Sequence, residues 1–174
     1  MRSTWVLALT IGGLLVAHPA GGQVGMGPNH KTGAPFRAKL SPPLADGTVL
    51  LVKGHVRDGA TGDGIDGAEL DAWQADATGH YDLDGFDYRA RVITDEQGYF
   101  EIETIVPSNY GPPPHIHMIV SAPGYGRTVT EMLFLDREHP TSERPELTPK
   151  LVERKHGAKT YLEGTFDVTL RRGA

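Results

Sequence analysis

Glycine and proline residues divide most of the chain into short segments, which suit strands and tight turns better than long helices. The 174 residues include 22 glycines and 13 prolines, whereas aromatic residues make up only 7%. In the segment 99–105, Phe100 and Ile102 alternate with glutamates, and this alternation is typical of a half-buried strand. Pro107 and the prolines at 112–114 exclude a helix between this segment and the next one.

Segments of this character recur along the chain, and together they predict an all-β fold. The expected architecture is a β-sandwich of roughly seven or more strands, with long Gly/Pro loops and little helix. The only plausible helical stretch is short, at 147–155. We expect one domain at 48–174, which is long enough to bury a core. The expected strands lie at 49–56, 68–74, 91–94, 99–105, 115–122, 128–135 and 165–170.

The first 22 residues have the pattern of a secretory signal peptide. Arg2 supplies a positive charge, residues 5–17 form an apolar run, and small residues follow. A membrane anchor is the competing interpretation, but the run is shorter than the roughly 20 residues that span a bilayer. The sequence therefore predicts an exported protein, periplasmic or secreted, with no membrane attachment once residues 1–22 are cleaved. An extended lead-in segment at 23–47, rich in glycine, proline and polar residues, precedes the domain.

Charge and cysteine content restrict the partners and the kinds of site. The net charge is -5 and no basic stripe is present, which argues against a nucleic-acid partner. The chain has no cysteine, so an exported domain gains no disulfide support. Any metal site must therefore use oxygen and nitrogen ligands.

Two histidines separated by one residue open the apolar segment 115–122. In a strand, residues i and i+2 project from the same face, so the imidazoles of His115 and His117 can reach one metal ion. Ile116, Met118 and Val120 would then fill the opposite face. The pair alone is a weak signal, because many such histidine pairs bind nothing.

Two tyrosines, Tyr110 and Tyr81, lie in expected loops of the chain. Tyr110 is followed by Gly111 and three prolines, a stiff stretch that could hold its phenol at a set distance from His115. Tyr81 follows the segment 68–74 and a glycine-containing turn with acidic residues around it. The alternative is that Tyr110 packs against a rigid loop and Tyr81 is a tyrosine at a strand-to-loop transition.

Several motifs in register resemble the intradiol ring-cleavage dioxygenases, the group of catechol and protocatechuate dioxygenases. The resemblance covers roughly residues 32–134 in the right order and near the right spacings. The motifs that carry it are the lead-in run at 32–37, the segments 67–81, 91–99 and 104–110, and the His115-Ile-His117 sequence.

This resemblance implies one ferric ion per chain, held by Tyr81 and His115 in the plane and by Tyr110 and His117 on the axis. It also implies a small catechol-type substrate and O2, with ring cleavage between the two hydroxylated carbons to give a muconate-type diacid. Tyr110 would then be catalytic, acting as a ligand and as a base. The ligand types suit this metal, because ferric iron favours hard anionic oxygen.

Two positions depart from the family pattern and bear on the substrate pocket. Pro112 stands where an arginine usually precedes the histidines, and Glu131 stands where a glutamine is usual. A carboxylate there would repel a negatively charged intermediate. Arg127, Arg89 or Arg91 could supply a substitute cation, although each also reads as a solvated surface charge. The expected pocket residues are therefore Pro112, Glu131 and Arg127.

Two other functions remain open from the sequence. One is an exported β-sandwich binding module, since the glycine and aspartate rhythm at 54–100 also resembles transthyretin-like domains. The other is a catechol or siderophore binder that holds iron without turnover. If the chain forms a homo-oligomer, we expect the interface to be built from the sandwich.

Overall fold

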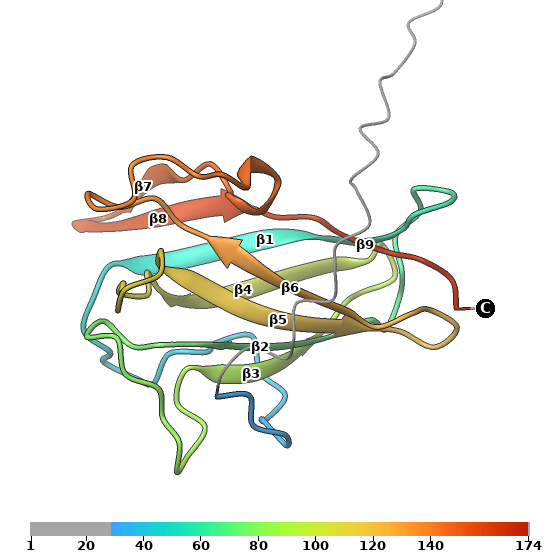
Figure 1. Cartoon of the computed structure of the whole chain (residues 1–174), viewed down its shortest axis with the longest axis horizontal. Helices are drawn as coiled ribbons and strands as arrows, with labels where there is room; N and C mark the ends of the chain where they lie inside the picture. Colours follow the sequence, from blue (N-terminus) through green and yellow to red (C-terminus); the bar gives the residue numbers. More distant parts are fainter. Residues whose placement is uncertain (1–28, 174) are drawn as a thin grey trace, which may run out of the picture.

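A computed structural model describes residues 29–173, which form two β-sheets (Figure 1). One sheet has five strands in the order β4-β1-β8-β7, with β9 also paired to β1, and the other has four strands in the order β3-β2-β5-β6. The predicted all-β sandwich is therefore confirmed. The expected signal peptide, 1–22, lies outside the described residues. Among residues 29–173, no helix is long and apolar enough to cross a membrane.

The strands follow the predicted segments closely over the middle of the chain. The segment predicted at 99–105 is strand β4 without any change of bounds. The strands are β1 (Val49–Asp58), β2 (Glu69–Gln74), β3 (Arg89–Ile93), β4 (Tyr99–Ile105), β5 (His115–Ser121), β6 (Thr128–Leu133), β7 (Val152–His156), β8 (Lys159–Thr165) and β9 (Val168–Leu170).

The core lies between the two sheets and is built by alternation along the strands. In β1, buried and partly exposed residues alternate, so Leu50 and Val52 point inward. From the other sheet, Ile116, Met118 and Val120 of β5 are fully buried in the same apolar cluster. The prediction that these three residues fill the face opposite the histidines is thus confirmed, and the histidine side of β5 is left for a site.

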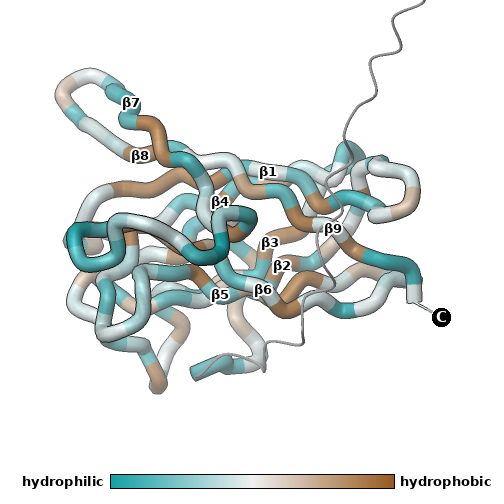
Figure 2. Tube along the Cα trace, turned by 45° about the horizontal axis from the view of Figure 1, so that its top comes forward, coloured by the Kyte–Doolittle hydropathy of each residue, from teal (hydrophilic) through white to brown (hydrophobic). Residues whose placement is uncertain are grey.

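The end of the chain differs from the prediction. The helix expected at 147–155 is wrong, because this region holds only a single 3-10 turn at Pro145–Leu147 followed by strand β7. All five residues of β7 are exposed, so no apolar face marks it as a strand in the sequence. Its register with β8 is set by backbone pairing across the turn at Gly157, whose φ is 60°. Figure 2 shows this hairpin standing away from the body of the sandwich.

The lead-in segment joins the edges of both sheets. Its backbone pairs with β3, where the amide of Arg37 donates to the carbonyl of Arg91 at 3.0 Å. It then pairs with β4, where the amide of Leu40 donates to the carbonyl of Glu103 at 2.9 Å. Because β3 and β4 belong to different sheets, this segment covers one side of the sandwich next to the core.

A buried carboxylate ties the end of β1 to two distant segments. Asp58 accepts hydrogen bonds from the Ala60 amide at 2.8 Å, from the Tyr125 hydroxyl at 2.8 Å and from Nε of Arg172 at 3.0 Å. These bonds lower the pKa of Asp58 to about 2, and the bond from the Ala60 amide has the largest effect, followed by the one from Tyr125. The ionised form is thus favoured in the folded protein.

We expect Asp58→Asn to destabilise the fold at neutral pH and to do so less in acid. The folded pKa lies below the unfolded value of about 3.9, so the stabilisation is present above that pH and is lost as the pH falls toward the folded value of about 2. Urea unfolding of both proteins from neutral pH to about pH 3 measures this difference. Asp66→Asn, at an exposed turn position, is the control. A destabilisation that stays constant with pH would contradict the assignment.

Candidate functional site

The structure brings the four predicted ligand residues together in one connected group. The hydroxyl oxygens of Tyr81 and Tyr110 lie 3.0 Å apart, and the Tyr110 oxygen lies 3.2 Å from Nε2 of His115. Nε2 of His115 lies 2.9 Å from Nε2 of His117. Two phenol oxygens and two imidazole nitrogens thus converge, although their residues lie up to 36 positions apart in the sequence.

The register of the four-stranded sheet places His117. Across this sheet, Arg89 of β3 pairs with Trp73 of β2, Trp73 pairs with His117 of β5, and His117 pairs with Glu131 of β6. Directly paired residues project from the same face of a sheet, and this face is the one turned away from the core. The indole of Trp73 stacks on the His117 ring with 5.0 Å between ring centroids. Trp73, which is only 1% exposed, therefore forms a wall of the site.

Both histidines are buried, and the contacts of each ring suit a metal ligand. Nδ1 of His115 lies 2.7 Å from the carbonyl oxygen of Pro113, which can only accept a hydrogen bond. Nδ1 therefore carries the proton, and Nε2 offers its lone pair. Burial, helped by the neighbouring His115, lowers the pKa of His117 to about 3. A metal ligand must be the neutral imidazole, and the low pKa of His117 keeps that ring neutral at physiological pH.

An aspartate turn delivers Tyr81 to the end of the sheet. Oδ1 of Asp76 accepts hydrogen bonds from the amides of Thr78 at 2.7 Å and His80 at 3.0 Å. The Asp76 amide also donates to the carbonyl of His80 at 2.8 Å. Burial alone would raise the pKa of Asp76, but the amides of His80 and Thr78 hold it below its usual value. The turn is thus closed on itself one residue before the tyrosine.

Tyr110 comes from the loop between β4 and β5, and this loop packs against the same turn. The Ser108 amide donates to the carbonyl of Asp76 at 3.2 Å. Gly79, with a φ of 88°, lies so close that an added Cβ would stand 3.0 Å from Cβ of Tyr110. Tyr110 is 42% exposed. Burial, and to a lesser degree the hydrogen bond with Tyr110, raises the pKa of Tyr81. One tyrosine is therefore held inside the site and the other lies at its surface.

Cations hold the backbone that follows Tyr81, a feature that the sequence did not reveal. Nζ of Lys31 donates to the carbonyls of Asp84 at 2.7 Å and Gly85 at 3.0 Å. Arg89 is only 2% exposed, and its Nη2 donates to the carbonyl of Asp82 at 2.9 Å. The reading of Arg89 as a solvated surface charge is wrong, because its guanidinium is used to anchor the loop of Tyr81.

The predicted pocket residues have different positions. Glu131 reaches the site, where its Oε2 lies 4.0 Å from Nδ1 of His117. Pro112 is an exposed residue of the loop that carries Tyr110. Arg127 is exposed in the turn between β5 and β6, at the opposite end of β5 from His115, and does not join the group. Arg144 approaches Glu131, and its Nη1 donates to Oε1 of that residue at 2.9 Å.

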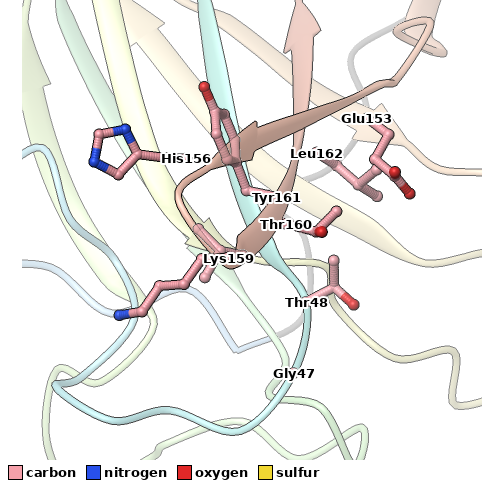
Figure 3. Close-up of a pocket in the computed structure, with 9 residues that line it drawn as sticks. Gly47, Thr48, Glu153, His156, Lys159, Thr160, Tyr161 and Leu162 are labelled. Carbon is pink, nitrogen blue, oxygen red and sulfur yellow. The ribbon is translucent and has the colours of Figure 1, made fainter.

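A pocket of about 440 Å³ opens beside Glu131 and Pro113. Leu133, Phe134 and Leu135 contribute apolar surface, and Arg144 lies on its wall. A separate hollow of about 680 Å³ lies at the β7–β8 hairpin, where it is lined by polar side chains that include His156, Lys159 and Tyr161 (Figure 3). None of the residues that line this second hollow belongs to the tyrosine–histidine group.

The donor atoms fit a hard, strongly acidic metal ion. A phenol ionises near pH 10 in water, so a tyrosinate at neutral pH requires such a cation. Burial makes this need greater at Tyr81, because it raises the pKa of that phenol. Ferric iron matches two anionic oxygens with two imidazoles, whereas zinc takes sets of histidine, cysteine and carboxylate. Glu131 with His115 and His117 forms a second group of that kind, with ligand atoms within 4.8 Å of one another.

Known proteins resemble this chain over most of its length. The family model described as Dioxygenase (Dioxygenase_C) matches residues 27–172. A curated catechol 1,2-dioxygenase from Acinetobacter baylyi is 31% identical over 166 residues, which cover 73% of this chain and 53% of that protein. The chain thus spans about half the length of the curated relatives it matches.

Solved structures extend this similarity to the fold. A 3-chlorocatechol 1,2-dioxygenase from Rhodococcus opacus 1CP superposes with a TM-score of 0.78 at 25% identity and covers 88% of this chain and 73% of its own. The dioxygenase domain of a dioxygenase and carbohydrate-binding protein fusion from Streptomyces sp. SirexAA-E gives 0.74 at 33% identity, covering 87% of this chain and 98% of that domain. With the family model matched over nearly the whole described chain, this protein belongs to the intradiol ring-cleavage dioxygenase family.

Proposed function

We propose that this protein is an iron(III)-dependent dioxygenase that opens the ring of a catechol-type substrate between its two hydroxylated carbons. The observation that carries the proposal is the convergence of Tyr81, Tyr110, His115 and His117, with neighbouring donor atoms 2.9 to 3.2 Å apart. Family membership supports it. In the reaction, catechol and O2 combine into a muconate-type diacid, and both oxygen atoms of O2 end in the product.

The four residues would hold the ferric ion, which when bound supplies a centre that takes both catechol oxygens and makes the ring reactive toward O2. Tyr81, His115 and His117 provide the fixed part of this ligand set. His117 is clamped by the stacked Trp73, and His115 is oriented by the carbonyl of Pro113. Such outer contacts fix the rings and preserve ligand geometry.

Tyr110 is the residue suited to receive the substrate's proton. It is the more exposed of the two tyrosines, and its oxygen lies within hydrogen-bond distance of both Tyr81 and His115. Its loop begins at the end of β4 and contains Gly111, whose φ of 125° strongly favours glycine. The phenolate oxygen of Tyr110 would accept a proton from an incoming catechol hydroxyl, as a positioned general base does.

The charge of the adjoining pocket favours an uncharged or cationic catechol over a carboxylated one. Glu131, Glu138 and Glu143 all line the pocket. The cation among its lining residues, Arg144, is already paired with Glu131. A substrate carboxylate would therefore meet like charges there, at a cost of roughly 1 to 4 kcal/mol for a pair about 4 Å apart near a protein surface.

Replacing the two tyrosines separates their roles. Ferric-loaded protein should be burgundy from tyrosinate-to-iron charge transfer and should consume O2 with catechol. Tyr81→Phe should lose most of the colour and iron affinity, whereas Tyr110→Phe should keep a weaker band and lose about 100-fold or more in kcat. Absorption spectra and an oxygen electrode give both readouts.

Tyr161→Phe, on strand β8, is the matched control for these variants. Colourless wild-type protein in the presence of ferric iron would overturn the proposal. Colour that persists unchanged in Tyr81→Phe would show that the ligand assignment is wrong. A coloured protein that takes up no O2 with any catechol would instead identify an iron-holding binder.

Substrate charge gives a second, independent test. We expect kcat/KM for 4-methylcatechol to exceed that for 3,4-dihydroxybenzoate by about tenfold or more, because the acidic pocket disfavours the carboxylate. The two compounds place a methyl group and a carboxylate at the same ring position. Equal kcat/KM values, or a preference for the acid, would contradict the assignment of this pocket to the substrate.

A further inference from the structure

Glu131 lies between a histidine of the site and an arginine from a distant part of the chain. On β6 it pairs directly with His117 of β5, and its Oε2 is 4.0 Å from Nδ1 of that ring. This distance is too long for a hydrogen bond. Because both side chains are largely buried, the charge of the carboxylate is only weakly screened at the ring. The Glu131 side chain is 18% exposed, and its other oxygen, Oε1, is held at 2.9 Å by Nη1 of Arg144.

The backbone of Arg144 is held by hydrogen bonds on both sides. Its amide donates to Oγ of Ser142 at 3.0 Å, and its carbonyl accepts from Oγ1 of Thr148 at 3.0 Å. The 3-10 turn at Pro145–Leu147 follows immediately. Nε of the guanidinium also lies 3.7 Å from Glu146. From this held backbone the side chain, which is 42% exposed, reaches Glu131 at the site.

The two ring nitrogens of His117 face different partners. Nε2 faces Nε2 of His115, whereas Nδ1 faces Glu131. In metal sites, a carboxylate beside the nitrogen that does not bind the metal raises the basicity of the ligating ring. We propose that Glu131 is a positioning residue that strengthens His117 as an iron ligand, and that Arg144 sets how much of the Glu131 charge His117 feels. This inference rests on the proposed function.

Removing the charge of Glu131 and removing the charge of Arg144 should change the iron site in opposite directions. Removal of the Glu131 charge makes His117 a weaker donor and leaves the ferric ion more acidic, so the tyrosinate-to-iron band moves to lower energy and the reduction potential rises. Removal of the Arg144 charge exposes the full carboxylate to His117, so the band moves to higher energy and the potential falls. If the two residues only held the fold, their replacement would not shift the band and the potential in opposite directions.

The test uses the ferric-loaded full chain with Glu131→Gln, Arg144→Met, the double variant, and Arg144→Lys. Visible absorption and redox titration are the readouts, and thermal unfolding of the metal-free proteins confirms that each variant is folded. Glu143→Gln is the matched control, because Glu143 lines the same pocket and is exposed. We expect Glu131→Gln also to weaken ferric affinity by about tenfold or more. Arg144→Lys should stay near the wild type.

The double variant decides whether Arg144 acts through Glu131. We expect the Arg144→Met shift to be largely lost in the Glu131→Gln background, as coupled residues require. An undiminished shift in that background, shifts of the same sign, or a Glu131→Gln shift no larger than that of Glu143→Gln would each overturn this inference while the proposed function stands. A wild-type protein that shows no charge-transfer band would overturn both.

Discussion

The antiparallel register of the four-stranded sheet is the constraint on which the site depends. It places Trp73, His117 and Glu131 directly opposite one another on three neighbouring strands, with Arg89 next in the same row. A slip of one residue in any of these strands would turn its side chain of this row into the core and bring an apolar one out. The packing of the opposite face into the core therefore stabilises the fold and also fixes the positions of these side chains.

The two tyrosines need a different support, because they come from loops rather than strands. Their loops are joined by the hydrogen bond between Ser108 and Asp76, and their close approach depends on Gly79. Lys31 and Arg89 then hold the backbone beyond Tyr81 by its carbonyl groups. The lead-in segment thus contributes to the site without supplying any of its four donor atoms.

The sequence was most informative where a local pattern decides the structure. Alternation marked β4, and the motifs marked Tyr81, Tyr110, His115 and His117, which the structure brings together. It failed at β7, whose exposed polar residues give no period.

Contacts between distant positions also stayed hidden. Arg89 donates to the carbonyl of Asp82, 7 residues away, and to that of Asn29, 60 residues away. Arg144 donates to Glu131, 13 residues away. No spacing rule identifies such partners. Arg127, chosen from its sequence neighbourhood, lies at the far end of β5 for the same reason.

The most direct test of the account is crystallography of the ferric-loaded protein with data collected at the iron absorption edge. We expect one anomalous peak per chain, bound by the oxygens of Tyr81 and Tyr110 and by Nε2 of His115 and His117. A peak bound by Glu131 in place of the tyrosines, or a peak at another position in the chain, would contradict it.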